Sequence, residues 1–362
     1  MRFIDPSSYV QSWVSNRATS LEFVGATGTV SGPYTIYTFT TAGTNNIQVR
    51  GQGVVDILMV GGGGGGASLG GGGGAGGYIY RQNTVLVGSN NAKNLPAADN
   101  YIQIGSGGLG PSTSPSHGPR AGSGTPTKIV CDGVAIIEAV GGGGGGGYST
   151  GDASFQDPAN GQYLGLHTSI NPASPIPSQV GPSFAGVRGG SGGGGSAAPN
   201  PTNSSPGGAG VFGQGHPGGL GHHSNHHKGG GGGGAGQMGG WTSPSWPGNR
   251  QHISGSGGDG LANDISGTER HYAGGGGGGG HWGGWVHAGI GGRGGGGNCG
   301  NYSPNHGSNA PAIANTGGGG GGGENPAQQS QGASGIIIVR VNNTLQQPRS
   351  SIRYHSPSGT SI

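Results

Sequence analysis

Apolar residues gather into short runs that look like strands, separated by long stretches that contain few hydrophobic side chains. Residues 34–41 are aromatic and β-branched, and residues 54–60 form an almost continuous apolar run. Both compositions are typical of β-strands. Asp132-Gly133 has the composition of a tight hairpin turn. Further strands are predicted at 46–49, 128–130, 134–140 and 335–341.

The first twenty residues have a helical pattern instead. Asp5 suits the cap of a short helix and Pro6 suits its first position. Residues 1–20 are therefore interpreted as an arm, which either packs on its own domain or fixes the protein to a larger particle. The candidate attachment residues share one face of this helix: Tyr9, Val10, Trp13 and Val14.

Glycine accounts for 97 of the 362 residues, whereas about 7% is usual. It occurs in solid blocks, so collagen, which needs glycine at every third position, is excluded. The intervals between blocks are unequal, which also argues against a solenoid. The blocks are Gly61–Gly66, Gly70–Gly77, Gly141–Gly147, Gly189–Gly195, Gly229–Gly240, Gly274–Gly280, Gly291–Gly297 and Gly317–Gly323.

Such blocks are flexible linkers by default. Their near purity, their similar lengths and their starts directly after the apolar residues Val60 and Val140 favour order instead. In a polyglycine II helix each residue rises by about 3.1 Å, and all backbone polar groups point outward. Neighbouring rods can pair those groups, provided that no Cβ intrudes. Candidate scaffold residues are Gly61, Gly72, Gly144, Gly193, Gly232, Gly277, Gly295 and Gly320.

The predicted fold is mainly β and irregular: a bundle of packed polyglycine II helices flanked by β-strands, with long surface loops and a short N-terminal helix. If successive blocks alternate in direction, loops 148–188, 241–273 and 298–316 share one end and loops 196–228 and 281–290 share the other. Parallel rods with returning loops are the alternative. The expected parts are an arm (1–20), a β-rich part with the first rods (21–140), the bundle (141–334), a closing strand (335–341) and a polar tail (342–362).

Charged residues make up only 7% of the chain, and the formal net charge is +3. This leaves no clustered basic surface for nucleic acid. No apolar stretch reaches about 18 residues, so no membrane insertion is expected. The start of the chain also lacks the apolar core of a secretory signal. Cys131 and Cys299 are far apart in sequence and are interpreted as inert thiols.

The sequence offers little support for catalysis or nucleotide binding. Any glycine block satisfies G-x-G-x-x-G, and Lys228 is followed by glycine where a phosphate-binding loop needs Ser or Thr. Asp264, Ser266 and His271 form a triad only on paper, because a triad is defined by geometry. We predict no enzymatic activity and no cofactor.

A histidine-rich segment is the densest cluster of potential metal ligands. Imidazoles this close together can bind a transition metal, but no cysteine or acid lies beside them. A polar surface loop is the favoured interpretation, with metal binding and receptor contact as alternatives. The weak metal candidates are His222, His223, His226 and His227.

Aromatic residues lie beside or within the expected loops. Tyr and Trp provide contact surfaces for proteins and sugars at low entropic cost. The alternative for Trp241, Trp282 and Trp285 is that they seal the sides of the bundle. The receptor-contact candidates are Phe155, Tyr163, Trp246, Tyr302, Trp241, Trp282 and Trp285.

The order of these features is similar to the glycine-rich domain of bacteriophage tail proteins. The features are Asp56–Val60, Gly61–Gly77, Tyr78, Thr84–Val87, Gly105-Ser-Gly-Gly108, Lys128–Val140, Gly141–Gly147 and the closing Gly332–Arg340. The similarity extends over about residues 33–341. The later blocks also resemble the distal tail-fibre adhesins of T-even-like phages, which implies a polyglycine II sandwich carrying variable receptor-reading loops.

This resemblance implies a protein on the virion surface, as a receptor-binding adhesin on a tail fibre. Its expected partners are a host cell-surface protein or glycan and other virion proteins. The alternatives are a purely structural virion protein (tail-tip, fibre-base or capsid-decorating) and a non-viral ice-binding or wall protein, which the irregular loops disfavour. The sequence leaves monomer and homotrimer open.

Overall fold

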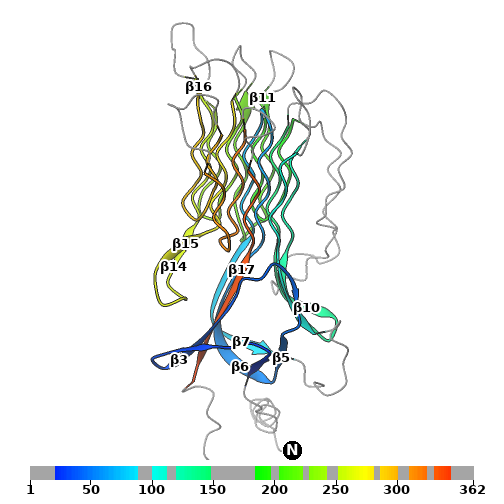
Figure 1. The fold of residues 1–362 in the computed structure, drawn as a ribbon, viewed down its shortest axis with the longest axis vertical. Coiled ribbons are helices and arrows are strands. Elements are labelled where there is room, and N and C mark those ends of the chain that lie inside the picture. Colours follow the sequence, from blue (N-terminus) through cyan, green and yellow to red (C-terminus); the bar gives the residue numbers. More distant parts are fainter. Residues whose placement is uncertain are drawn as a thin grey trace, which may run out of the picture.

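The computed structural model describes residues 21–88, 100–111, 120–147, 184–196, 204–222, 228–242, 252–280, 286–300, 310–323 and 330–343. They form an elongated molecule, with β-sheets at one end and a bundle of extended segments along the rest (Figure 1). We call the sheet end the base and the opposite end the tip. The described part contains strands and no helix, which confirms the mainly β fold. The helix predicted within residues 1–20 lies outside the described residues.

The larger sheet of the base has five strands, all in antiparallel pairs. Its central strand is the last strand of the chain, so Ile337 pairs with Phe39 on one side and with Met59 on the other. The predicted runs 34–41, 54–60 and 335–341 all contribute to this sheet. The order is β2 (Thr29–Ser31), β3 (Tyr34–Phe39), β17 (Ile336–Asn342), β6 (Gln52–Val60) and β7 (Tyr78–Val87).

A four-stranded sheet and a two-stranded pair complete the base. The predicted hairpin is confirmed: Asp132 and Gly133 have φ of 52° and 74°, the left-handed values that a tight hairpin turn requires. The four-stranded order is β10 (Val134–Ala139), β9 (Thr127–Cys131), β8 (Tyr101–Ile104) and β4 (Gly43–Asn45), and β1 (Glu22–Val24) pairs with β5 (Gln48–Arg50).

The two faces of the five-stranded sheet are covered by different parts of the chain. One face packs Ile57 and Ile337 into a fully buried cluster with Ile102 and Ile129 of the four-stranded sheet. Burying side chains of this size contributes about 1.5–3 kcal/mol each.

The other face lies under the hairpin of β14 (Leu261–Asn263) and β15 (Arg270–Tyr272), which leaves the bundle beside the base (Figure 1). Ile265 of its turn is fully buried in a cluster with Leu58 and Ile338. The hairpin therefore closes the second face of the sheet.

The glycine segments pair laterally with a period of three residues. Segment 61–66 illustrates it, because its successive N–H groups donate to three different neighbouring segments in turn. Gly61 and Gly64 donate to Gly77 and Gly74, whereas Gly62 and Gly65 donate to Thr125 and Gly122. Gly63 and Gly66 donate to Ala333 and Ser330. A β-strand alternates with a period of two, so these segments are not sheet strands.

Three more neighbours donate to the same segment. Its carbonyls accept from the N–H groups of Gly142, Gly145, Gly320 and Gly108 at 2.8–3.0 Å. Segment 61–66 is thus enclosed on all sides by backbone. The other enclosed segments coincide with predicted glycine blocks: 70–77, 141–147, 189–195, 229–234, 274–280 and 317–323 are buried at every position.

Most of the periphery of the bundle consists of segments that were predicted as loops. Two predicted glycine blocks also contribute to it: Gly229–Gly240 bends after residue 234 into an outer segment, and Gly291–Gly297 contains a turn at residues 293–295. Only some residues of the outer segments need to be glycine, because a side chain that faces solvent meets no neighbour. Exposed side chains therefore recur at every third position on outer segments, as in Ser106 and Leu109, Pro206 and Ala209, Met238 and Trp241, Ile253 and Ser256, and Ile290 and Arg293.

These outer segments overturn the predicted alternation of glycine blocks. The N–H groups of Gly143 and Gly146 donate to Ser191 and Gly194, so blocks 141–147 and 189–195 run in the same direction. The chain returns between them through residues 184–188, where Val187 donates to Gly144. The distribution of loops over two ends, which followed from that alternation, is therefore wrong.

Candidate binding surface at the tip of the bundle

The described chain reaches the tip many times. Ser196 donates to Phe184 at 2.8 Å, His222 to Lys228 at 3.0 Å, Gly229 to Gly279 at 2.7 Å and Gly300 to Gly322 at 3.1 Å. These bonds tie together the residues where the chain leaves and re-enters the bundle. The short strands β11 (Ser204–Ser205), β12 (Gly221–His222), β13 (His252–Ile253) and β16 (Val286–His287) belong to this end, where Figure 1 labels β11 and β16.

Seven intervals are bounded at both ends by tip residues: 148–183, 197–203, 223–227, 243–251, 281–285, 301–309 and 324–329. Every one of the predicted long loops contains at least one of them. By contrast, β1 begins and β17 ends at the base (Figure 1). The molecule therefore has a marked polarity along its axis.

Buried hydroxyl groups satisfy backbone carbonyls where the inner segments reach the tip. Ser196 Oγ donates to the carbonyl of Gly147 at 3.0 Å, and Ser254 Oγ donates to that of Gly279 at 3.1 Å. A buried carbonyl without a hydrogen-bond partner is costly. These serine hydroxyls supply the donor at the end of the bundle, and a glycine, which has no side chain, could not. Neither serine was among the predicted site residues, although a serine that adjoins a glycine run is the signal that could have indicated it.

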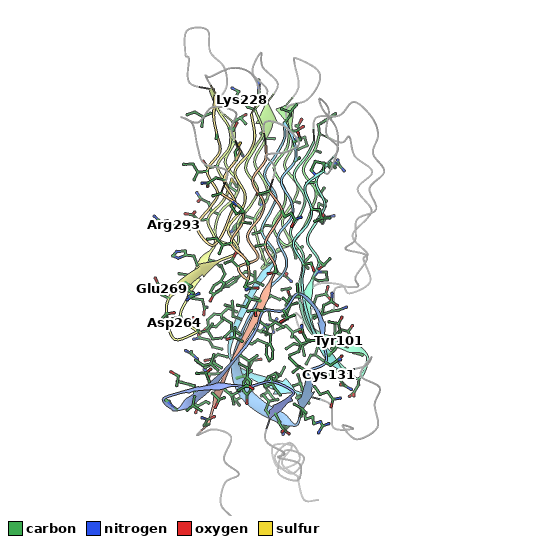
Figure 2. All side chains as sticks on the ribbon, in the orientation of Figure 1. Tyr101, Cys131, Lys228, Asp264, Glu269 and Arg293 are labelled. Atoms are coloured by element: carbon green, nitrogen blue, oxygen red, sulfur yellow. The ribbon has the colours of Figure 1, made fainter. Side chains whose placement is uncertain are left out.

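Lys228 is the most unusual side chain at the tip (Figure 2). It is fully buried, and this burial lowers its pKa through desolvation. Its backbone forms β-bridges with His222 and with Gly280. Among the described residues, the buried Nδ1 of His222 and Oγ of Ser205 have no hydrogen-bond partner. The tip therefore combines a buried amine with buried polar groups inside a lattice made mostly of glycine.

Trp241 is the receptor-contact candidate that the structure describes. It lies on outer segment 237–242 close to the tip, and 65% of its surface is exposed. A tryptophan that sealed the bundle would be buried, so the sealing alternative is wrong for Trp241. The other receptor-contact candidates and the attachment residues lie outside the described residues: Phe155, Tyr163, Trp246, Tyr302, Trp282, Trp285, Tyr9, Val10, Trp13 and Val14.

The predicted scaffold glycines are buried, and all but Gly295 lie where a Cβ would overlap the backbone of another segment. At Gly232, for example, the overlap is with the carbonyl oxygen of Gly73. Gly295 belongs to a turn, with φ of 92°, and its Cβ would meet the side chain of Thr316. An added Cβ would overlap the backbone of another segment at these seven predicted scaffold positions: Gly61, Gly72, Gly144, Gly193, Gly232, Gly277 and Gly320.

A family model described as a glycine-rich domain matches residues 40–269, from the strands of the base through much of the bundle. The chain belongs to this glycine-rich domain family. No curated protein matches the chain.

The remaining predicted sites of this glycine-rich domain protein are only partly described. Of the weak metal candidates, His222 is described, whereas His223, His226 and His227 lie outside the described residues. Within the part of the chain that the structure covers, no group of three or more His, Cys, Asp or Glu residues is placed to hold a metal ion. No helix there is long and apolar enough to cross a membrane.

The three residues of the hypothetical catalytic triad, Asp264, Ser266 and His271, lie in the β14–β15 hairpin. Ser266 Oγ donates to the carbonyl of Thr268 at 3.0 Å, and His271 lies opposite Ala262 in the strand pair. Ser266 and the exposed Asp264 lie in the turn of this hairpin (Figure 2). The serine hydroxyl therefore stabilises the local turn.

Proposed function

We propose that this protein is a receptor-binding adhesin of a phage tail fibre, located on the virion surface. The observation that carries the proposal is the polarity of the molecule: the chain repeatedly leaves and re-enters the bundle at the tip, far from the sheets. Intervals of unequal length that are bounded by residues of one rigid end can vary in sequence without disturbing the core. The exposed Trp241 close to this end adds an aromatic contact residue.

We further propose that the glycine segments are polyglycine II helices. The support is their lateral hydrogen bonding with a period of three residues, which is the repeat of that helix. Each helix makes its bonds to its neighbours, so rigidity comes from the bundle as a whole. Such a platform holds the tip intervals at fixed entry and exit points.

The base is the proposed attachment end. Residues 1–20 precede β1 there, and an apolar face of Tyr9, Val10, Trp13 and Val14 would dock on other virion proteins. The tip would then contact a host cell-surface protein or glycan. A single copy and a homotrimer both fit this arrangement.

Exchange of tip intervals tests the adhesin proposal. Residues 148–183 and 243–251 would be replaced by unrelated sequences of equal length, and adsorption of the resulting particles to host cells would be measured. We expect adsorption to be lost or redirected while particles still assemble. The matched control replaces 89–99, which is bounded by strands of the base and is expected to leave adsorption unchanged. Unchanged adsorption after the tip exchanges would contradict the proposal.

A purely structural virion protein is the second candidate. It is compatible with the family match, because the matched residues 40–269 contain several strands of the base and much of the bundle, and a scaffold of this kind needs no receptor. Density maps of intact particles would separate the two: a position at the end of a fibre supports the adhesin, and a position within a lattice supports the structural role.

A further inference from the structure

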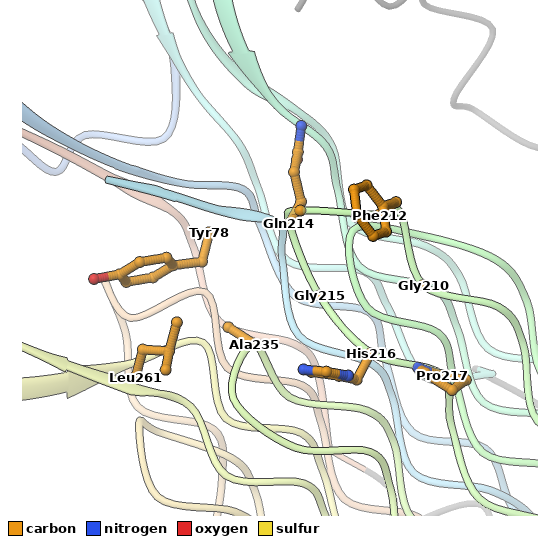
Figure 3. A pocket seen from close by; sticks show the side chains of 10 residues that line it. Tyr78, Gly210, Phe212, Gln214, Gly215, His216, Pro217, Ala235 and Leu261 are labelled. Carbon is orange, nitrogen blue, oxygen red and sulfur yellow. The ribbon is translucent and has the colours of Figure 1, made fainter. Parts of the chain in front are cut away.

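A cavity of about 500 Å³ lies on the side of the bundle, where the bundle meets the base (Figure 3). Phe212, His216 and Pro217 line one side, Tyr78 and Leu261 the other, and Ala235 lies between them. Pockets that bind small ligands usually measure about 300–1,000 Å³ and are mostly apolar with a few polar groups. This cavity has that size and that character.

The turn that carries Phe212 is held firmly. The N–H groups of Gln214 and Gly215 both donate to the carbonyl of Val211, and Gly213 has φ of 77°, which glycine adopts at little cost. The Gln214 side chain accepts from the N–H of Val140 at 2.9 Å. Hydrogen bonds within the turn and a hydrogen bond to Val140, next to the base, therefore hold the backbone of the turn in place.

Phe212 is nevertheless 86% exposed. An aromatic side chain this exposed adds almost nothing to the core, yet its backbone is fixed in position. Because the backbone is fixed, contact with a ligand costs only the rotational freedom of the Phe212 side chain, which is a low entropic cost. The fold therefore holds an aromatic surface ready at the mouth of the cavity.

The opposite side of the cavity is mainly apolar. Leu261 is partly exposed, and the Tyr78 ring lies beside it with its hydroxyl directed away from the cavity, where it accepts a buried hydrogen bond from Asn263 Nδ2 at 3.0 Å (Figure 3). Among the described residues that line the cavity, none is Asp, Glu, Lys or Arg. An ionic ligand would therefore lose hydration without gaining a counter-charge.

We infer that this cavity binds a neutral pyranose ring of a glycan. The C–H face of such a ring is apolar and slightly positive, which suits the negative face of an aromatic ring such as Phe212. Its hydroxyl groups can pair with the exposed His216 and with the glycine backbone around it. The site lies away from the tip and does not depend on the proposed receptor contact.

Binding of simple sugars to the full chain tests this inference. The probes are the methyl glycosides of glucose, galactose, mannose and N-acetylglucosamine, with N-acetylneuraminic acid as the charged comparison. Saturation-transfer NMR would detect binding, and titration would give each Kd. We expect at least one neutral glycoside to bind in the millimolar range and the charged sugar not to bind.

Matched variants assign the binding to the cavity. Phe212→Ala should weaken it about tenfold, since an aromatic anchor is lost, whereas Phe212→Tyr should retain it. Ile290→Ala removes another exposed apolar side chain from an outer segment and should change nothing. Because both residues are exposed, the variants should keep the melting temperature of the parent.

Three results would overturn the inference. They are no binding of any neutral glycoside, binding that Phe212→Ala leaves unchanged, and tighter binding of N-acetyltryptophanamide than of every glycoside. The last would identify the cavity as a site for a protein side chain. Replacement of the tip intervals should leave sugar binding intact, so failure here and failure of the adhesin proposal are distinguishable.

Discussion

The base and the bundle reach the same degree of burial by opposite means. In the base, Ile57 and Ile337 fill the space between two sheets, as in most β proteins. In the bundle, segment 61–66 is equally buried, but carbonyl and N–H groups of other segments fill the space around it. The base therefore depends on side chains that are present, and the bundle on side chains that are absent.

The first prediction removes atoms from the base. Ile337→Ala should lower the free energy of unfolding by about 2–5 kcal/mol, because it deletes a fully buried side chain at the centre of the five-stranded sheet and leaves a cavity. Denaturant unfolding measures the loss. Val30→Ala, at a position that is 71% exposed, should lower stability far less. A loss at Ile337 no larger than at Val30 would refute the role of this core.

The second prediction adds atoms to the bundle. Gly232→Ala should destabilise by about 1–3 kcal/mol, because the new methyl group overlaps the Gly73 carbonyl and neither backbone can yield locally. Thermal unfolding followed by circular dichroism would report the change. An alanine normally stabilises relative to glycine where it fits, so the sign of the effect is diagnostic.

Ser256→Ala is the control, because it leaves the same alanine side chain at an exposed position of an outer segment, where the native serine already carries a Cβ. Its effect should stay within about 0.5 kcal/mol. Equal effects at Gly232 and Ser256 would mean that the inner segments are not close-packed.

The third prediction concerns the smallest effect, a buried carboxyl in the base. Burial raises the pKa of Glu138, against the opposing influence of Lys128. The folded protein thus binds this proton more tightly than the unfolded chain, so stability declines as pH rises from about the unfolded value through the raised folded pKa. Above that range the loss is complete and constant.

Glu138→Gln should therefore raise the melting temperature at pH 7 and have much less benefit at pH 3. Melting curves at both pH values test the sign. Glu269→Gln, at an exposed position in the β14–β15 turn, should show no such difference. A Glu138→Gln variant that is stabilised equally at both pH values would exclude the carboxyl as the cause.

Much of the base could be predicted from the sequence, because its strands follow ordinary alternation and β-branched composition. The Asp132-Gly133 hairpin and the closing run at 335–341 are examples. The inner glycine segments could also be predicted from the sequence. Because they are closely packed on every side, almost every position must be glycine, and this produces the nearly pure glycine blocks.

The outer segments could not be predicted in the same way. They need glycine only where they face a neighbour, so residues such as Ile253 and Ile290 dilute the pattern until it resembles a loop. The outer segments carry the chain back toward the base or the tip. Both the repeated arrival of the chain at the tip and the cavity beside Phe212 depend on them. Their signal is a small residue at two of every three positions, which becomes recognisable only once the lattice is known.

Amide hydrogen exchange along the whole chain tests most directly whether backbone pairing forms the core of the bundle. The account predicts that amides of residues 141–147 and 274–280 exchange as slowly as those of β17 in the base. Rapid exchange of both glycine segments, with β17 still protected, would contradict it.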